Sequence, residues 1–149
     1  MAILLGGDGG NTKTIALVAT PDGSILGAGR GGCSDIYGAT SPEAALDQIA
    51  YAVQAALSAA GKQSEDILAG CFSLAGADWP EDYTYLQARM EAFGFGRTIT
   101  IYNDALRAGS PDGTGVVIAC GTGAAIAARN AEGRYWHTSF WQNRWVGSN

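Results

Sequence analysis

Short apolar runs alternate with glycine-rich turns over the first thirty residues, a pattern typical of strands joined by hairpins. The apolar runs cover residues 2–8, 14–20 and 24–30, and Gly9-Gly10-Asn11 and Pro21-Asp22-Gly23 separate them. In the second turn, proline presets the backbone φ and glycine accepts a positive φ. The pattern predicts a three-stranded antiparallel meander.

Two segments with helical periodicity follow the meander. The first begins at Ser41-Pro42-Glu43, where serine is a good N-cap and proline suits the first helical position, and it ends at Gly61. The second opens at Asp78-Trp79-Pro80 and ends at Gly94. The residues expected to face the core are Leu46, Ile49, Ala50, Val53, Ala56, Leu57 and Ala60 in the first helix and Tyr83, Leu86, Met90 and Phe93 in the second.

Further strands are predicted over residues 67–75 and 97–102, then at 115–120, 124–130 and 134–138, with a helical turn at 105–108. A meander followed by two helical crossovers predicts an α/β fold with a mixed five-stranded sheet, in which strands one, four and five are parallel. Parallel strands end at the same sheet edge, so Asp8, Asp78 and Asp104 should gather there. Open α/β sheets bind ligands at this edge.

Composition excludes several classes of protein. The chain has 149 residues, the size of one ordinary domain, and its 47% hydrophobic content argues against disorder. A net charge of −5 argues against a nucleic-acid partner, and no apolar run is long enough to cross a bilayer. The three cysteines (Cys33, Cys71, Cys120) are too far apart to indicate a disulfide framework or zinc site. We expect a cytoplasmic protein.

The run GGDGGNTKT (residues 6–14) is the first candidate for chemistry. Glycines let backbone N–H groups approach phosphate oxygens, hydroxyl and ammonium groups add donors, and Asp8 suits a magnesium ion held through water. A glycine-rich hairpin without a ligand is the alternative. Gly121-Thr122-Gly123 is a second turn of the same kind, which suggests a two-loop phosphate clamp or another ordinary hairpin.

Asn103-Asp104 follows the fifth predicted strand. A carboxylate there can accept a proton from an attacking hydroxyl, or it can cap the helical turn at 105–108. The residues alone leave both roles open.

Taken in order, GGDGGNTKT, SLAGAD, YNDA and SPDGTGVVIACGTGA resemble the BadF/BadG/BcrA/BcrD ATPase family, which includes N-acetylglucosamine and glucosamine kinases. The resemblance covers nearly all of residues 3–138. It implies the ribonuclease H-like fold of the actin-like ATPase and sugar kinase superfamily. It also implies ATP and Mg²⁺ as cofactors and phosphoryl transfer to a sugar or amino sugar hydroxyl.

The resemblance also implies roles for individual residues. Asp104 would be the base that activates the sugar hydroxyl, and Asp8 would assist the metal. Asp35, Asp78 and Asn103 would lie where sugar contacts are expected, although the sugar kinases often carry asparagine near position 35. The phosphate loops would be formed by Gly9, Gly10, Asn11, Thr12 and Lys13 and by Gly121, Thr122 and Gly123.

Family members have two lobes and about twice this length. We expect residues 1–112 to form the N-terminal lobe and residues 113–149 to begin the second, with weak activity or none from these residues alone. One alternative is a non-catalytic nucleotide-binding module that self-associates. Another is an activator ATPase of the 2-hydroxyacyl-CoA dehydratase type.

Aromatic residues crowd the C-terminal end of the sequence, at Tyr135, Trp136, Phe140, Trp141 and Trp145. Without a second lobe to pack them they would be exposed. They predict a homodimer, a strand exchange through this tail or a disordered end. His137 is expected to be a surface or interface residue.

Overall fold

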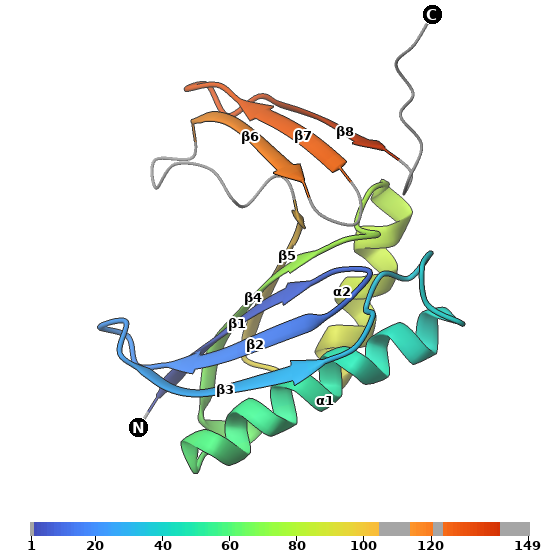
Figure 1. Ribbon diagram of the computed structural model, residues 1–149. Coiled ribbons are helices and arrows are strands. Elements are labelled where there is room, and N and C mark those ends of the chain that lie inside the picture. The colour runs from blue at the N-terminus through green and yellow to red at the C-terminus, as the bar shows by residue number, and fades with distance from the viewer. Residues whose placement is uncertain (1, 105–113, 121–123, 141–149) are drawn as a thin grey trace, which may run out of the picture.

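The computed structural model of the chain describes residues 2–104, 114–120 and 124–140 (Figure 1). The predicted helical turn at 105–108, the loop at 121–123 and the tail from 141 onward lie outside these ranges. The elements in order are β1 (Ile3–Gly9), β2 (Thr14–Ala19), β3 (Ile25–Gly31), α1 (Pro42–Ala60), a 3₁₀ turn (Ser64–Asp66), β4 (Ile67–Leu74), α2 (Pro80–Ala92), β5 (Thr98–Asn103), β6 (Gly115–Cys120), β7 (Ala124–Arg129) and β8 (Tyr135–Phe140).

The first five strands form one mixed sheet in the order β3-β2-β1-β4-β5. β2 pairs antiparallel with both β1 and β3, whereas β4 pairs parallel with β1 and with β5. The predicted mixed sheet is therefore confirmed. The carboxyl ends of its parallel strands lie in register, with Gly9 beside Leu74 and Leu74 beside Asn103.

α1 begins and ends where the sequence predicts. The Ser41 hydroxyl accepts a hydrogen bond from the backbone N–H of Ala44, and Gly61 adopts the left-handed conformation (φ 61°) at the C-cap. Its buried stripe differs slightly from the prediction, because Ala45 and Ala52 are fully buried while Ala50 and Ala60 are only partly buried.

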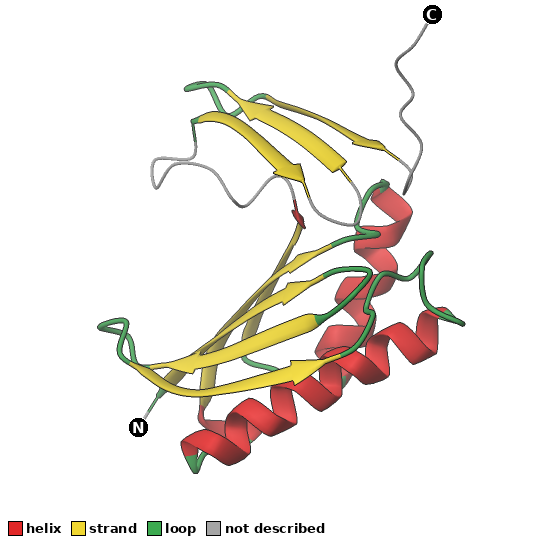
Figure 2. Cartoon of the chain, in the orientation of Figure 1, coloured by secondary structure: helices red, strands yellow, loops and turns green. Residues whose placement is uncertain are grey.

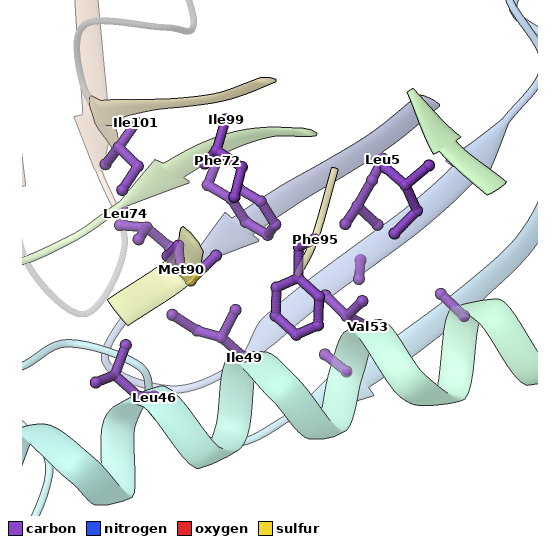
Figure 3. Packing of buried hydrophobic residues seen from close by; sticks show 14 of the residues in the cluster. Leu5, Leu46, Ile49, Val53, Phe72, Leu74, Met90, Phe95, Ile99 and Ile101 are labelled. Atoms are coloured by element: carbon purple, nitrogen blue, oxygen red, sulfur yellow. The ribbon is translucent and has the colours of Figure 1, made fainter. Parts of the chain in front are cut away.

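α1 and α2 cover the same face of the sheet and enclose one hydrophobic core (Figures 2 and 3). Phe72 of β4 lies at its centre with no exposed surface, and its ring centroid is 6.3 Å from that of Phe95. Leu86 and Met90 of α2 are also fully buried, while Tyr83 and Phe93 are only partly buried. Among the described residues, no helix is both long and apolar enough to span a membrane.

α1 lies very close to β3 because alternate residues of that strand are glycines. A Cβ atom added to Gly27 or Gly29 would overlap the carbonyl oxygen of Ala56 or Ala52, one turn apart on α1. A Cβ on Gly31 would likewise overlap the Gln48 carbonyl oxygen. The glycines of β3 therefore set the distance between helix and sheet.

β6, β7 and β8 form a separate three-stranded antiparallel sheet. One row of neighbouring residues across this sheet consists of Val116, Ala128 and Trp136. The exposed fractions of Val116 and Trp136 are 70% and 58%. β8 continues to Phe140, beyond the predicted end at residue 138.

Candidate functional site

The candidate site lies at the carboxyl ends of β1, β4 and β5. Asp8 is the next-to-last residue of β1, and Asp104 directly follows β5. β4 lies between these strands, so the axes of β1 and β5 are about 10 Å apart. The prediction that Asp8 and Asp104 share one sheet edge is therefore confirmed.

Asp8 lies on the sheet face that the helices leave uncovered. In the strand register it sits between Ile15 and Ser73, and its side chain is exposed. The Ser73 hydroxyl lies 3.5 Å from the carbonyl oxygen of Asp104 and donates to it. Ser73 therefore links the strand beside Asp8 to the residue expected to act as the base.

The β1–β2 hairpin ends in a tight turn at the same edge. The backbone N–H of Gly10 donates to the carbonyl oxygen of Lys13 at 2.9 Å, and Thr12 and Lys13 are exposed at the tip. Thr14 is buried, and its hydroxyl donates to the carbonyl oxygen of Gly32 at 2.8 Å. Thr12 and Lys13 are thus exposed at the hairpin tip, whereas Thr14 fixes the hairpin to the loop after β3.

The glycines of the GGDGG run have different functions. A Cβ on Gly7 would overlap the Phe72 ring, and a Cβ on Gly9 would overlap the Ser34 hydroxyl, so core packing requires both glycines. Gly6 has no neighbour within 4 Å of the added atom, and Gly10 has only the Lys13 carbonyl oxygen at 3.9 Å. Within this run, only Gly6 and Gly10 have room for an added Cβ atom.

Asn11 and Asp35 form a hydrogen-bonded pair between the hairpin and the loop after β3. Asn11 Nδ2 donates to Asp35 Oδ2 at 2.7 Å, and the backbone N–H of Tyr37 donates to Asp35 Oδ1 at 2.9 Å. Gly38 and Gly76 make room for the pair, because a Cβ on Gly38 would overlap Asn11 and one on Gly76 (φ 82°) would lie 2.7 Å from Asp35 Oδ1. The Asn11 side chain is therefore directed at Asp35, and the pair joins the β1–β2 hairpin to the loop after β3.

Asn103 and Asp78 form a second pair at the end of β5. Asn103 is almost completely buried, and its Nδ2 donates to Asp78 Oδ1 at 2.8 Å and to the carbonyl oxygen of Ala77 at 3.3 Å. The Tyr83 hydroxyl accepts from the backbone N–H of Asn103 at 3.2 Å. These contacts bring Asp78 to the same edge as Asp8 and Asp104, as the sequence predicts.

Asp82, in the first turn of α2, is a buried carboxylate that the sequence analysis did not single out. Its Oδ2 accepts the backbone N–H groups of Asp78 and Trp79 at 3.1 and 2.8 Å, and its Oδ1 accepts the Tyr37 hydroxyl at 2.6 Å. An acidic residue at the third position of a helix is a recognisable capping signal, so the sequence did contain a local signal for Asp82. The sequence contained no local signal for Tyr37, because its hydrogen-bond partner Asp82 is 45 residues away.

The hydrogen bond to Asp82 raises the pKa of Tyr37 to about 12, with smaller contributions from burial and from the negative charges of Asp82, Asp78 and Glu81. Ionisation would remove the donated proton and place a phenolate beside a carboxylate. The Tyr37 hydroxyl therefore stays protonated, and donates to Asp82, throughout the physiological pH range.

The described residues contain no group of three or more histidine, cysteine, aspartate or glutamate side chains placed to hold a metal ion. Asp8 offers one exposed carboxylate, which suits an ion such as Mg²⁺ that keeps most of its water ligands. The three cysteines are free thiols.

Comparison with known proteins gives consistent matches. The sequence profile of the BadF/BadG/BcrA/BcrD ATPase family matches residues 5–142. The N-acetylmuramic acid/N-acetylglucosamine kinase of Clostridium acetobutylicum is 30% identical over 146 residues. That alignment covers 95% of this chain and 47% of the clostridial enzyme.

Solved structures agree on the fold. A protein assigned as an N-acetylglucosamine kinase from Chromobacterium violaceum superposes with a TM-score of 0.71 at 22% identity, covering 97% of this chain and 50% of its own. One with the same assignment from Porphyromonas gingivalis gives 0.65 at 25% identity, covering 84% and 44%. The chain thus spans about half the length of the relatives it matches.

Proposed function

Because this chain belongs to the BadF/BadG/BcrA/BcrD ATPase family, we propose that it carries the phosphate-binding and base-bearing part of an ATP-dependent kinase that phosphorylates N-acetylglucosamine or a related amino sugar. The observation that carries the proposal is the common sheet edge of Asp8, the β1–β2 hairpin tip and Asp104. The similarity to the clostridial kinase supports the class of substrate.

The proposed reaction needs one proton acceptor and a site that binds the triphosphate of ATP. The Asp104 carboxylate takes the proton of the sugar hydroxyl while the hydroxyl oxygen forms a bond to the γ-phosphorus, and the bond from that phosphorus to the β,γ-bridging oxygen breaks to release ADP. Because one strand, β4, separates the strands that lead to Asp8 and Asp104, the proposal assigns the γ-phosphate to the hairpin side and the sugar to the β5 side.

The hairpin fits the phosphate side of this reaction. Gly10 leaves open space, and the exposed hydroxyl and ammonium groups of Thr12 and Lys13 stand at the tip. A magnesium ion at Asp8 would supply charge neutralisation of the phosphates during transfer. In this proposal the loop of Gly121, Thr122 and Gly123 completes the phosphate clamp, and residues 1–112 and 113–149 belong to separate lobes.

Asp35, Asp78 and Asn103 are the proposed sugar contacts. All three are at or next to the same edge, and hydrogen bonds hold each of them in place. A carboxylate at position 35 accepts hydrogen bonds but donates none, so it favours a sugar that presents a hydroxyl or amide N–H there.

Catalysis by these 149 residues alone is expected to be slow, since closure that excludes water requires both lobes. The self-associating module and the dehydratase activator remain alternatives to the kinase. A cytoplasmic location is part of the proposal.

Thermal unfolding with ligands, together with radiolabelled phosphate transfer, tests the proposal. Mg-ATP at a hundred times its Kd should stabilise the fold by about 2.7 kcal/mol. Slow transfer to N-acetylglucosamine or glucosamine should fall about 10²- to 10⁴-fold in Asp104→Asn, as expected for loss of a general base. Asp47→Asn, an exposed carboxylate of α1, is the matched control and should behave as wild type.

The outcomes separate the alternatives. Stabilisation by Mg-ATP together with phosphate transfer to an amino sugar would support the kinase, whereas no stabilisation by Mg-ATP or by either amino sugar would favour the non-catalytic module. No stabilisation by Mg-ATP would contradict the proposal at its first step.

A further inference from the structure

A continuous series of hydrogen bonds runs from the hairpin to the end of β5. Asn11 donates to Asp35, and the same loop carries Tyr37, whose hydroxyl donates to Asp82. Asp82 accepts the backbone N–H of Asp78. Asp78 in turn accepts Asn103 Nδ2. The two candidate sugar-binding carboxylates, Asp35 and Asp78, are thus joined through Tyr37 and Asp82.

We propose that Tyr37 and Asp82 are positioning residues that fix Asp35 and Asp78 relative to one another for the sugar. This inference rests on the proposed function. Tyr37 makes hydrogen bonds with both its backbone and its side chain. Its backbone N–H donates to Asp35 Oδ1, and its hydroxyl donates to Asp82 Oδ1. Asp82 uses its other oxygen to hold the backbone of Asp78 and Trp79.

The carboxylates in this series of hydrogen bonds are buried. Asp82 is only 5% exposed and Asp35 only 9%, so each carboxylate depends on its protein donors rather than on water. Tyr37 as a whole residue is 54% exposed. Removing the Tyr37 hydroxyl therefore takes away one donor from buried Asp82 without opening a cavity in the core.

Tyr37→Phe is the decisive variant, and Tyr51→Phe, at an exposed position of α1, is the matched control. Nitrogen-15 NMR spectra report on the side-chain amides of Asn11 and Asn103, neither of which is bonded to the Tyr37 hydroxyl. Tyr37→Phe should shift the Asn103 side-chain amide and leave the unfolding temperature close to that of wild type. Tyr51→Phe should shift neither amide.

The functional readout is the affinity for N-acetylglucosamine, measured by titration beside that for Mg-ATP. We expect Tyr37→Phe to weaken sugar binding about tenfold, as loss of one hydrogen bond to a charged group allows, and to leave Mg-ATP binding within about twofold. A merely structural role would lower the unfolding temperature without this split. Asp82→Asn, whose amide can still accept a backbone N–H and contact Tyr37, should weaken sugar binding less.

The possible failures are distinguishable. If wild type binds no sugar, the proposed function fails at its substrate and the positioning role with it. If wild type and Tyr37→Phe bind sugar equally, or if the Asn103 amide does not move, only the positioning role is overturned.

Discussion

One face of the five-stranded sheet is covered by α1 and α2, whereas the other carries partly exposed side chains. On the covered face, Phe72 and Val18 have no exposed surface. On the uncovered face, Leu17, Gly6, Cys71 and Thr100 follow one another across four strands, and Leu17 is 37% exposed. A depression that includes Leu4, Cys71, Thr100 and Tyr102 lies there.

This difference in burial shows that the two faces of the sheet have different roles, one in stability and the other next to the candidate site. The covered face holds the residues whose burial stabilises the lobe. On the uncovered face, neighbouring strands carry Asp8, Ser73 and Tyr102 side by side, next to the candidate site at the carboxyl edge. Substitutions on the two faces should therefore have very different consequences for stability.

Truncation of a large side chain should give the largest contrast. Phe72→Ala should reduce the free energy of unfolding by about 3–5 kcal/mol, because it removes a buried ring and leaves a cavity. Leu17→Ala, on the uncovered face, should cost about 1 kcal/mol or less. Urea unfolding measures both, and equal losses would show that the second face is also buried in solution.

Addition of a single methyl group should give a smaller contrast of the same kind. Gly29→Ala should cost about 1–3 kcal/mol, because its Cβ would overlap the Ala52 carbonyl oxygen and push α1 away from the sheet. Gly6→Ala, with no atom within 4 Å of its new Cβ, should be close to neutral. Thermal unfolding compares them, and a neutral Gly29→Ala would refute the close helix–sheet contact.

The smallest expected effect is a change with pH at Tyr37. Because the folded state raises the pKa of Tyr37 from 10.0 to about 12, the stability linked to its hydroxyl is fully present below pH 10 and is lost as pH rises towards 12. Tyr37→Phe should lack this component, so the difference in stability between the two proteins should shrink over that range. A constant difference from pH 9 to pH 12 would contradict the Tyr37–Asp82 bond.

Local signals explain which parts of the fold were predictable from the sequence. Ser41-Pro42 and Gly61 mark the ends of α1 through residue types that act within one turn, and the prediction was accurate. The shared edge of Asp8 and Asp104 followed from the prediction that strands one, four and five are parallel, because a meander is followed by two helical crossovers. The order of the strands within the sheet was not predicted. These features need no knowledge of side-chain contacts.

The contacts within the candidate site were not predictable in the same way. Asn11 pairs with Asp35 across 24 residues and Tyr37 with Asp82 across 45, and no local pattern encodes either pair. Gly7 and Gly9 lie in the run predicted to bind phosphate, and nothing in the sequence indicated that an added Cβ would overlap the Phe72 ring at Gly7 or the Ser34 hydroxyl at Gly9. Whether a glycine serves packing or a ligand depends on the three-dimensional neighbours of its Cα atom.

Binding of Mg-ATP, followed residue by residue in nitrogen-15 NMR spectra, shows directly whether the β1–β2 hairpin holds the phosphates. We expect the backbone amides of Gly10, Asn11, Thr12 and Lys13 to shift on titration, while those of Gly23 and Gly61, outside the proposed site, do not. Shifts confined to Gly23 and Gly61, or no shift at the β1–β2 hairpin at saturating Mg-ATP, would contradict it.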